Sequence, residues 1–179
     1  LTSLVRDGKL SWRPEQGQWE VFVFTAPRRP LTLNPMHPDA GQRVIDRFLQ
    51  PCQDHAPDGT PEGLGYFFQD ELMFGVGGRL WTDDFAQEFQ RRKGYKLAEV
   101  LPALYRDIGP LTPKVRIDYA DVQMQLSEER YFAPIFEWHR SRGLIYGCDP
   151  GSRGRNPSEF GDYMRAVRWY TAPGHDTPG

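Results

Sequence analysis

Four short, mostly apolar runs along the chain predict β-strands, and segments with helical spacing separate most of them. The runs are residues 19–24, 64–68, 144–148 and 166–170. Runs that are apolar on consecutive positions are typical of strands buried on both faces, as in a parallel sheet. The first run is expected to pair with residues 9–12 across a turn at 14–17, where Pro14 and Gly17 are typical turn residues. We therefore expect a β-hairpin ahead of a parallel sheet.

Helices are predicted where apolar residues recur every three or four positions. The expected helices cover about residues 38–49, 82–94, 97–107, 115–139 and 160–165. Pro38 and Thr82 favour helix N-termini, and Gly94 stands where a glycine ends a helix. Pro134 lies inside the longest pattern and is expected to kink it, and Gly143 ends it. Strands that alternate with helices in this way indicate parallel β/α units.

Composition narrows the class of protein. The chain of 179 residues is long enough for one domain, and 26% charged with 39% hydrophobic residues is typical of a folded globular chain. A net charge of −2 gives no indication of nucleic acid or an anionic membrane as a partner, and no apolar run reaches the roughly 20 residues that span a bilayer. Cys52 and Cys148 follow no metal-binding spacing, so neither a disulfide framework nor a zinc site is expected. Because the chain begins with Leu1 rather than Met, we expect a piece of a longer protein.

Acidic residues follow three of the four predicted strands. Asp70 and Glu71 follow the second strand, Asp149 follows the third, and Asp176 comes shortly after the fourth. In a β/α barrel the carboxyl ends of all strands open onto one face, where the active site forms, so acids after separate strands would converge. The alternative is that each acid caps the helix that follows it. No Gly-x-Gly-x-x-Gly or P-loop pattern follows a strand, which argues against a nucleotide-binding sheet.

The fold class that these patterns predict is α/β, a partial TIM-type (β/α)8 barrel with about four β/α units, preceded by a β-hairpin. A complete barrel has eight strands and typically about 250 residues. Four strands in 179 residues therefore correspond to the first half. We divide the chain into a lead-in hairpin strand over residues 1–18 and the N-terminal half of a catalytic barrel over residues 19–179, truncated at its end.

Several short motifs occur in an order that makes the chain recognisable. A predicted strand that ends in acids, at residues 65–71, precedes Trp-Thr-Asp-Asp-Phe at 81–85, Arg-Arg-Lys-Gly-Tyr at 91–95 and Leu-Pro-Ala-Leu at 101–104. The lead-in at 17–21 and Pro-Gly-His-Asp at 173–176 complete the set. With these motifs the chain, from about residue 12 onward, resembles a group of large bacterial glycoside hydrolases that includes the α-L-rhamnosidase family, glycoside hydrolase family 106. The resemblance implies a (β/α)8 catalytic domain, flanked by β-sandwich domains in the parent chain.

Asp70 and Glu71 are the candidate catalytic residues. Glycoside hydrolysis usually needs two carboxyl groups, an acid that protonates the leaving oxygen and a base or nucleophile. Because neighbouring residues of a strand point to opposite faces, Asp70 and Glu71 are not expected to form one catalytic pair. We expect Glu71 to face the pocket, with Asp70 as the second choice and the partner carboxylate in the missing half of the barrel. The alternative is that both residues cap the next loop.

Six further residues are candidates for binding the substrate. They are Asp149, His175, Asp176, Trp81, Trp169 and Arg153. Carboxylates bind sugar hydroxyls or a calcium ion, and the flat faces of tryptophan side chains stack on sugar rings. Apart from calcium, no metal or cofactor is expected. The alternatives are a solvated loop around Arg153, a structural role for His175, and core packing for both tryptophans.

The function that the residues and the resemblance together predict is cleavage of glycosidic bonds by carboxylate acid/base chemistry, with α-L-rhamnosidase-like activity as one form of it. The expected partner is an oligosaccharide or glycoside substrate. Neither nucleic acid nor a membrane is expected as a partner. The alternatives are a barrel that binds carbohydrate without cleaving it and a metal-dependent hydrolase with Asp70, Asp149 and Asp176 as ligands. The location of the parent protein stays open, with a periplasmic or secreted parent as one candidate.

Overall fold

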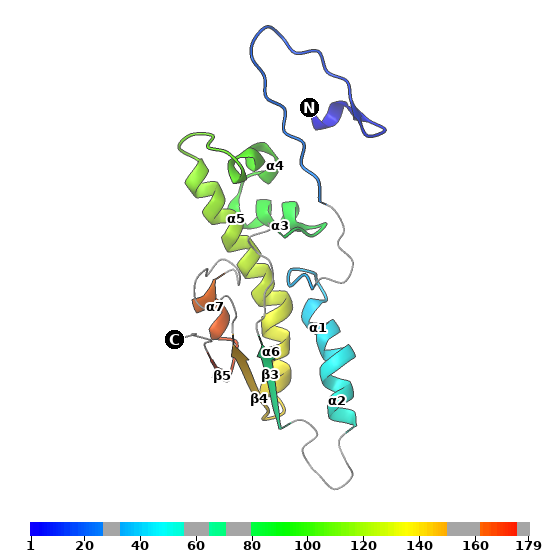
Figure 1. Ribbon diagram of the computed structural model, residues 1–179, viewed down its shortest axis with the longest axis vertical. Helices are drawn as coiled ribbons and strands as arrows, with labels where there is room; N and C mark the ends of the chain where they lie inside the picture. The colour runs from blue at the N-terminus through cyan, green and yellow to red at the C-terminus, as the bar shows by residue number, and fades with distance from the viewer. Residues whose placement is uncertain (27–32, 56–64, 71–79, 150–161, 175–179) are drawn as a thin grey trace.

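The structure is a computed structural model, and it describes residues 1–26, 33–55, 65–70, 80–149 and 162–174 (Figure 1). Within these residues, helices and strands form a mixed α/β arrangement, which confirms the predicted fold class at that level. None of the helices among the described residues is both long and apolar enough to cross a membrane.

A parallel sheet of three strands lies along one side of the helices (Figure 1). The strands are β3 (Tyr66–Asp70), β4 (Ile145–Asp149) and β5 (Ala172–Pro173), in the order β3-β4-β5. Both pairings are parallel. The second and third predicted strands are thus confirmed, because both apolar runs are strands of one parallel sheet. Their order along the sheet follows their order along the chain, as it does in successive β/α units.

Two long helical runs cover one face of this sheet. The first comprises α1 (Ala40–Val44), η2 (Ile45–Leu49) and α2 (Gln50–Asp54), and the second comprises α5 (Thr112–Ser127), η5 (Glu128–Phe132) and α6 (Ala133–Arg140). Their apolar side chains and those of the sheet share one core. It contains Ala40, Ile45, Leu49, Met124, Tyr131, Phe132, Ile135, Trp138, Tyr146, Cys148, Ala166 and Tyr170. Burial of this core holds the sheet against the helices.

The long second run is distorted near Pro134, as the sequence predicts. Proline has no backbone N–H to donate to the carbonyl four residues earlier, so a regular α-helix cannot continue through it unchanged. The chain forms the π-helical segment η5 immediately before α6, in which Pro134 occupies one of the first two positions. The wider π-helical turn accommodates the residue that cannot donate a hydrogen bond. The two α-helical parts on either side continue as one run.

A second core lies between the N-terminal part of α5 and three short elements. These are α3 (Phe85–Lys93), α4 (Leu97–Val100) and the 3-10 helix η4 (Leu101–Leu104). Phe85, Phe89 and Val115 are buried in this core. Gly94 adopts a φ of 80° directly after α3 and ends that helix, as predicted.

The N-terminal hairpin differs from the predicted one. A 3-10 helix η1 (Thr2–Leu4) leads into β1 (Val5–Arg6), which pairs antiparallel with β2 (Lys9–Leu10). Asp7 and Gly8 connect them with positive φ angles of 49° and 74°, which suit a tight two-residue hairpin turn. The predicted strand at residues 19–24 is wrong, because this segment pairs with no strand among the described residues and Trp19, Val21 and Val23 are exposed.

The fourth predicted strand, residues 166–170, is also wrong. Asp162 accepts a hydrogen bond from the backbone N–H of Arg165 at 3.1 Å and caps a helix, α7 (Tyr163–Val167). Ala166 and Val167 therefore belong to α7, and β5 begins only at Ala172. The expected helical stretch at 160–165 is confirmed in its described part, but it extends further along the chain than predicted.

Candidate functional site

Asp70 and Asp149 lie side by side at the carboxyl edge of the sheet. They are the last residues of β3 and β4, and they are partners in the parallel register of these strands. Neighbouring strands lie about 4.8 Å apart, so the two carboxylates start from adjacent backbone positions. Asp70 is exposed and Asp149 is half-buried. The structure thus brings together two of the acids that the sequence predicts at strand ends.

The two faces of β3 differ, and this difference places Asp70. Phe67 packs against Phe48 of η2 and His139 of α6, at ring separations of 5.7 Å in both cases, so it faces the helices. Gln69 also faces the helices, because its side chain contacts Tyr131 of η5. Side chains alternate along a strand, so Asp70 points to the opposite face together with Phe68. That face carries no helix among the described residues.

Asp149 has a carboxylate oxygen in an unusual environment. Its Oδ1 atom is buried and has no hydrogen-bond partner among the described residues. A buried polar atom without a partner costs roughly 1–3 kcal/mol, and such atoms are rare in folded proteins. Among the described residues, the capacity of this oxygen to accept a hydrogen bond or to bind a cation is unused.

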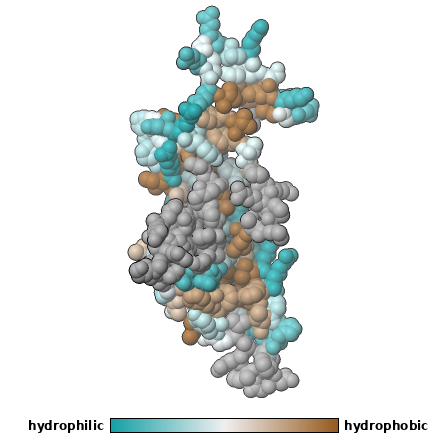
Figure 2. Space-filling model, in the orientation of Figure 1, coloured by the Kyte–Doolittle hydropathy of each residue, from teal (hydrophilic) through white to brown (hydrophobic). Residues whose placement is uncertain are grey.

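Below the two acids, the open face of the sheet is aromatic. Tyr66 and Phe68 stack on each other at 6.1 Å and are 53% and 41% exposed. Gly147 of β4 lies under both rings, and a Cβ atom there would come within 3.1 Å of Phe68 Cδ2 and of Tyr66 Oη. Glycine at this position lets the two rings lie flat across β4. Ile145 extends the apolar face, and Figure 2 shows hydrophobic surface at the level of the sheet.

On the helix side of the sheet, Gln69 joins a buried group of tyrosines that the sequence analysis did not single out. Its Oε1 accepts hydrogen bonds from the hydroxyl groups of Tyr146 at 2.6 Å and Tyr170 at 3.1 Å, and its Nε2 donates to Tyr131. Burial raises the pKa of Tyr131 to about 12 and raises the pKa values of Tyr146 and Tyr170. All three hydroxyls stay protonated at neutral pH and act as hydrogen-bonding groups. A glutamine at the end of an apolar run was the available signal in the sequence.

Burial disfavours the charged forms of two neighbouring groups, His139 and Cys148. Burial lowers the pKa of His139, whose Nδ1 lies 2.8 Å from the carbonyl of Ile135 and whose Nε2 has no partner among the described residues. Burial also raises the pKa of the Cys148 thiol to about 11. His139 stacks on Tyr146 at 4.5 Å and serves as a core residue, which agrees with its place on an apolar helix face.

The other predicted site residues divide into two groups. Glu71, Arg153, His175 and Asp176 lie outside the described residues. Trp81 and Trp169 are half-buried, and their contacts are with the core: Trp81 packs against Phe85 at 5.2 Å, and Trp169 packs against Phe136 at 6.0 Å. The indole N–H of Trp169 donates to Glu128 at 3.3 Å. Among the described residues, no group of three or more His, Cys, Asp or Glu side chains is placed to hold a metal ion.

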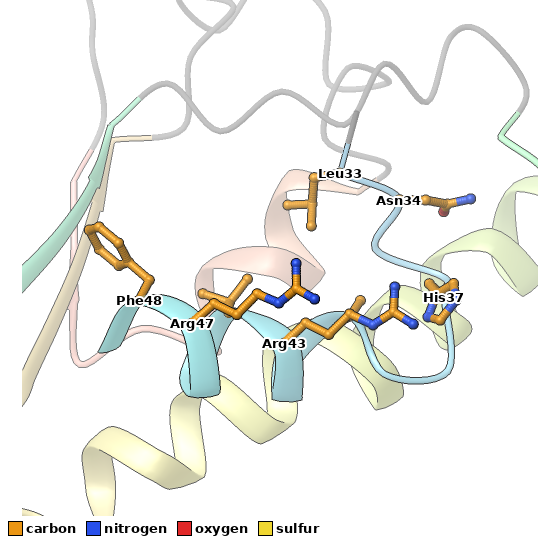
Figure 3. A pocket seen from close by; sticks show the side chains of 8 residues that line it. Leu33, Asn34, His37, Arg43, Arg47 and Phe48 are labelled. Carbon is orange, nitrogen blue, oxygen red and sulfur yellow. The ribbon is translucent and has the colours of Figure 1, made fainter. Parts of the chain in front are cut away.

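A cavity of about 410 Å³ lies beside α1 and η2 (Figure 3). It is lined by Leu33, Asn34, His37, Ala40, Arg43, Val44, Arg47 and Phe48. Arg43 and Arg47 stand one helical turn apart, and Arg43 pairs with Asp39 at 3.4 Å outside the lining. Among the described residues its lining contains basic, apolar and amide side chains and no carboxylate. Acid/base hydrolysis needs carboxyl groups, so the edge with Asp70 and Asp149 is the stronger candidate site.

Comparison with known proteins identifies the family of the chain. A model of glycoside hydrolase family 106, described as alpha-L-rhamnosidase, matches residues 1–165. The class of protein is therefore the glycoside hydrolases. The chain belongs to this family. It is also 24% identical over 166 residues to a protein of Formosa agariphila named "Putative beta-glucuronidase". That match covers 84% of this chain and 14% of the relative, so the chain spans about one seventh of the relative's length.

Proposed function

We propose that this chain is part of the catalytic domain of a glycosidase that cleaves glycosidic bonds by carboxylate acid/base chemistry. The observation that carries the proposal is the register of β3 and β4. It sets Asp70 beside Asp149 at the carboxyl edge of a parallel sheet, on the face away from the helices. Active sites of β/α barrel enzymes form at this edge. Membership of the glycoside hydrolase family gives the type of reaction.

The two acids have the chemistry that the reaction needs. One carboxyl group protonates the oxygen of the leaving sugar, and the other activates water or attacks the anomeric carbon. The carboxyl groups are roughly 5 Å apart in retaining enzymes and about 6.5–9.5 Å apart in inverting enzymes. The alternation along β3 favours Asp70 for the pocket, and Glu71, the next residue, stays the second candidate. In this proposal Asp149 supplies either the partner carboxylate or a hydrogen-bond acceptor for the substrate.

We further propose that the sheet is part of the first half of a (β/α)8 barrel. Three parallel strands follow one another in chain order, and helices cover one of their faces. The other face exposes Tyr66, Phe68 and Ile145, which is expected of side chains that point into a barrel. The length of the Formosa relative leaves ample room in a parent protein for the remaining strands and for flanking β-sandwich domains.

The substrate of the proposed enzyme is a glycoside or an oligosaccharide. The family description favours a terminal α-L-rhamnosyl group, and the name of the Formosa relative makes a β-glucuronide the alternative. Arg153, His175 and Asp176 remain proposed substrate ligands, together with Trp81 and Trp169. Calcium remains a proposed ligand of Asp149 and Asp176, since Ca²⁺ prefers oxygen ligands. Asp149 Oδ1 supports this, because it is a buried carboxylate oxygen without a partner among the described residues.

The proposal is tested in the full-length parent protein with aryl α-L-rhamnosides and aryl β-glucuronides. Asp70→Asn, Glu71→Gln and Asp149→Asn each remove one carboxylate with little change of shape. A general acid or base contributes about 100-fold or more, so at least one variant should lose that much kcat while its Tm stays near that of the wild type. Asp46→Asn, an exposed change on η2, is the matched control. Retention of full kcat by all three variants would place the chemistry elsewhere.

A further inference from the structure

We propose that Gln69 is a positioning residue that sets where the Asp70 carboxylate at the end of β3 lies relative to Asp149. The inference deepens the proposed function and rests on it for its consequence for catalysis. Its own evidence is the set of hydrogen bonds that Gln69 makes on the helix side of the sheet.

The amide of Gln69 uses both its donor and its acceptor. Oε1 accepts hydrogen bonds from Tyr146 and from Tyr170, at 2.6 Å and 3.1 Å, and Nε2 donates to the hydroxyl of Tyr131. All three tyrosines are buried, with 0%, 7% and 1% of their surface exposed in that order. Because water does not compete for these groups, each hydrogen bond is stronger than it would be on the surface, and the loss of one leaves a buried polar atom unpaired.

The network joins β3 to three other parts of the described structure. Tyr131 belongs to η5, Tyr146 belongs to β4, and Tyr170 lies between α7 and β5. The rings of Tyr146 and Tyr170 also contact each other directly, with their centroids 4.5 Å apart. One side chain of β3 is thereby tied to the neighbouring strand, to the chain that leads into the third strand, and to the helix layer.

Gln69 stands one residue before Asp70, and its side chain points to the opposite face. The backbone at this point is held from two directions: by the ladder to Cys148 within the sheet, and by the tyrosine network behind it. Asp70 projects from this anchored backbone, and among the described residues its carboxylate makes no hydrogen bond or ion pair on the open face. The network therefore acts on Asp70 through the backbone. A displacement of about 1 Å at a reacting group can cost roughly 100-fold in rate.

The test uses the full-length parent protein and the variants Tyr146→Phe/Tyr170→Phe and Gln69→Leu. The double variant removes both donors to Gln69 Oε1 and keeps the aromatic rings. Tyr95→Phe is the matched control, because the Tyr95 hydroxyl donates to Asp118 at 2.7 Å between α3 and α5, away from the sheet. We expect the double variant to lose about 10-fold or more in kcat with KM changed less than about 3-fold, since misplaced catalytic groups lower turnover. Tyr95→Phe should lower Tm to a similar extent and leave kcat within about 2-fold.

Crystal structures of the parent and of the same variants give a readout that does not depend on activity. The inference requires the separation of the Asp70 and Asp149 carboxyl groups to change in Tyr146→Phe/Tyr170→Phe and to stay the same in Tyr95→Phe. An unchanged separation overturns it, as does a kcat equal to that of the control in an active parent. A parent without hydrolytic activity contradicts the proposed function, and the measured separation still decides the role of Gln69. If Gln69→Leu does not fold, the double variant carries the test.

Discussion

At the scale of single residues, a buried carboxylate on η5 fixes the C-terminal part of the chain. Glu128 is buried and forms ion pairs with Arg165 of α7 and with Arg168, the latter at 2.8 Å. It also accepts a hydrogen bond from the indole N–H of Trp169. Trp169, a predicted sugar-stacking residue, is thus engaged with an acid on the long helix. Arg165 adds an ion pair with Asp121 at 2.6 Å, so that α7 is attached to α5 and η5 at several points.

Glu128→Gln should destabilise the protein. It removes the buried charge that pairs with Arg165 and Arg168, whose side chains are 30% and 60% exposed. Because both guanidinium groups are partly in solvent, we expect a cost of about 1–3 kcal/mol, below that of a fully buried pair. Chemical denaturation of the parent protein measures this cost, with Glu137→Gln as the control, because Glu137 and Arg140 form an exposed pair that contributes about 1 kcal/mol or less. Equal stability of the two variants would contradict the role of Glu128 in holding α7 against the long helix.

Asp84 gives the protein a specific dependence on acid. The hydrogen bond from the Arg130 guanidinium, at 2.6 Å, holds the pKa of Asp84 below its usual value of 3.8. A carboxyl group whose pKa is lowered by folding stabilises the folded state at pH values above the unfolded pKa. That contribution is lost as the pH falls below about 3.8 and the carboxylate takes up a proton.

The expected result is that Asp84→Asn lowers the free energy of unfolding near pH 6, and that its difference from the wild type shrinks as the pH falls below about 3.8. Urea denaturation at a series of pH values measures this difference. The exposed Asp54→Asn on α2 is the control. If the difference in unfolding free energy between Asp84→Asn and the wild type were the same at neutral and acidic pH, the charge of Asp84 would not contribute to stability.

At the scale of elements, the fold depends on a close contact between α1 and η5. Gly41 of α1 lies against the backbone of η5, where a Cβ atom would come within 2.8 Å of the carbonyl oxygen of Tyr131 and 3.0 Å of that of Arg130. Only a residue without a side chain allows the two helices to approach this closely. The π-helical turn at η5 faces this contact and also carries Tyr131 of the Gln69 network and Glu128. The position of α1 is thus linked to the candidate site through η5.

Gly41→Ala is expected to destabilise the protein by about 1–3 kcal/mol, even though alanine favours helices, because the added methyl group meets backbone atoms that cannot rotate away. Thermal unfolding of the parent protein measures the effect. Gln42→Ala is the matched control on the same helix, because Gln42 is exposed and should change stability by less than about 0.5 kcal/mol. If Gly41→Ala raised Tm, as helix propensity alone predicts, the close backbone contact between α1 and η5 would be contradicted.

At the scale of the whole molecule, the sheet of the described residues is open on one face and at both edges. Among these residues β3 and β5 each pair with β4 and have no partner on the other side. Tyr66, Phe68 and Ile145 are exposed on the face away from the helices. Open strand edges and exposed apolar faces recruit other chains. In the proposed barrel, this face and these edges are where the remaining strands would pack.

The isolated chain of residues 1–179 is expected to self-associate and to lack glycosidase activity. Static light scattering at increasing concentration should give a mass above that of one chain, 20.7 kDa. Phe68→Thr/Ile145→Thr should lower the measured mass, because both changes make the open face more polar and keep a side chain that suits a strand. Ile117→Thr on α5, a residue that is 68% exposed, is the control. A monomeric wild-type chain that hydrolyses a glycoside would refute the half-barrel proposal.

Several features of this protein follow from local sequence, and the structure bears them out. Apolar runs predict the strands Tyr66–Asp70 and Ile145–Asp149, but not the burial on both faces that such runs suggest, since Tyr66, Phe68 and Ile145 are exposed. Gly94 ends α3, because glycine adopts a positive φ without strain. The acids at the ends of β3 and β4 meet at one edge, because parallel strands have the same direction. The Asp7-Gly8 pair is also a local signal for a hairpin turn, although the sequence analysis predicts the hairpin between residues 9–12 and 19–24 instead.

Other features depend on contacts between segments far apart in the chain. Residues 19–24 have the composition of a strand, but a strand forms only where a neighbour supplies hydrogen bonds, and none of the described strands does so. Residues 166–170 are equally apolar, and the cap that Asp162 provides makes their first part helical. The Gln69 network joins residues up to 101 positions apart, so no local pattern could reveal it. Residue type limits which local conformations are favourable, whereas hydrogen-bond partners and packing neighbours come from the folded chain and select among them.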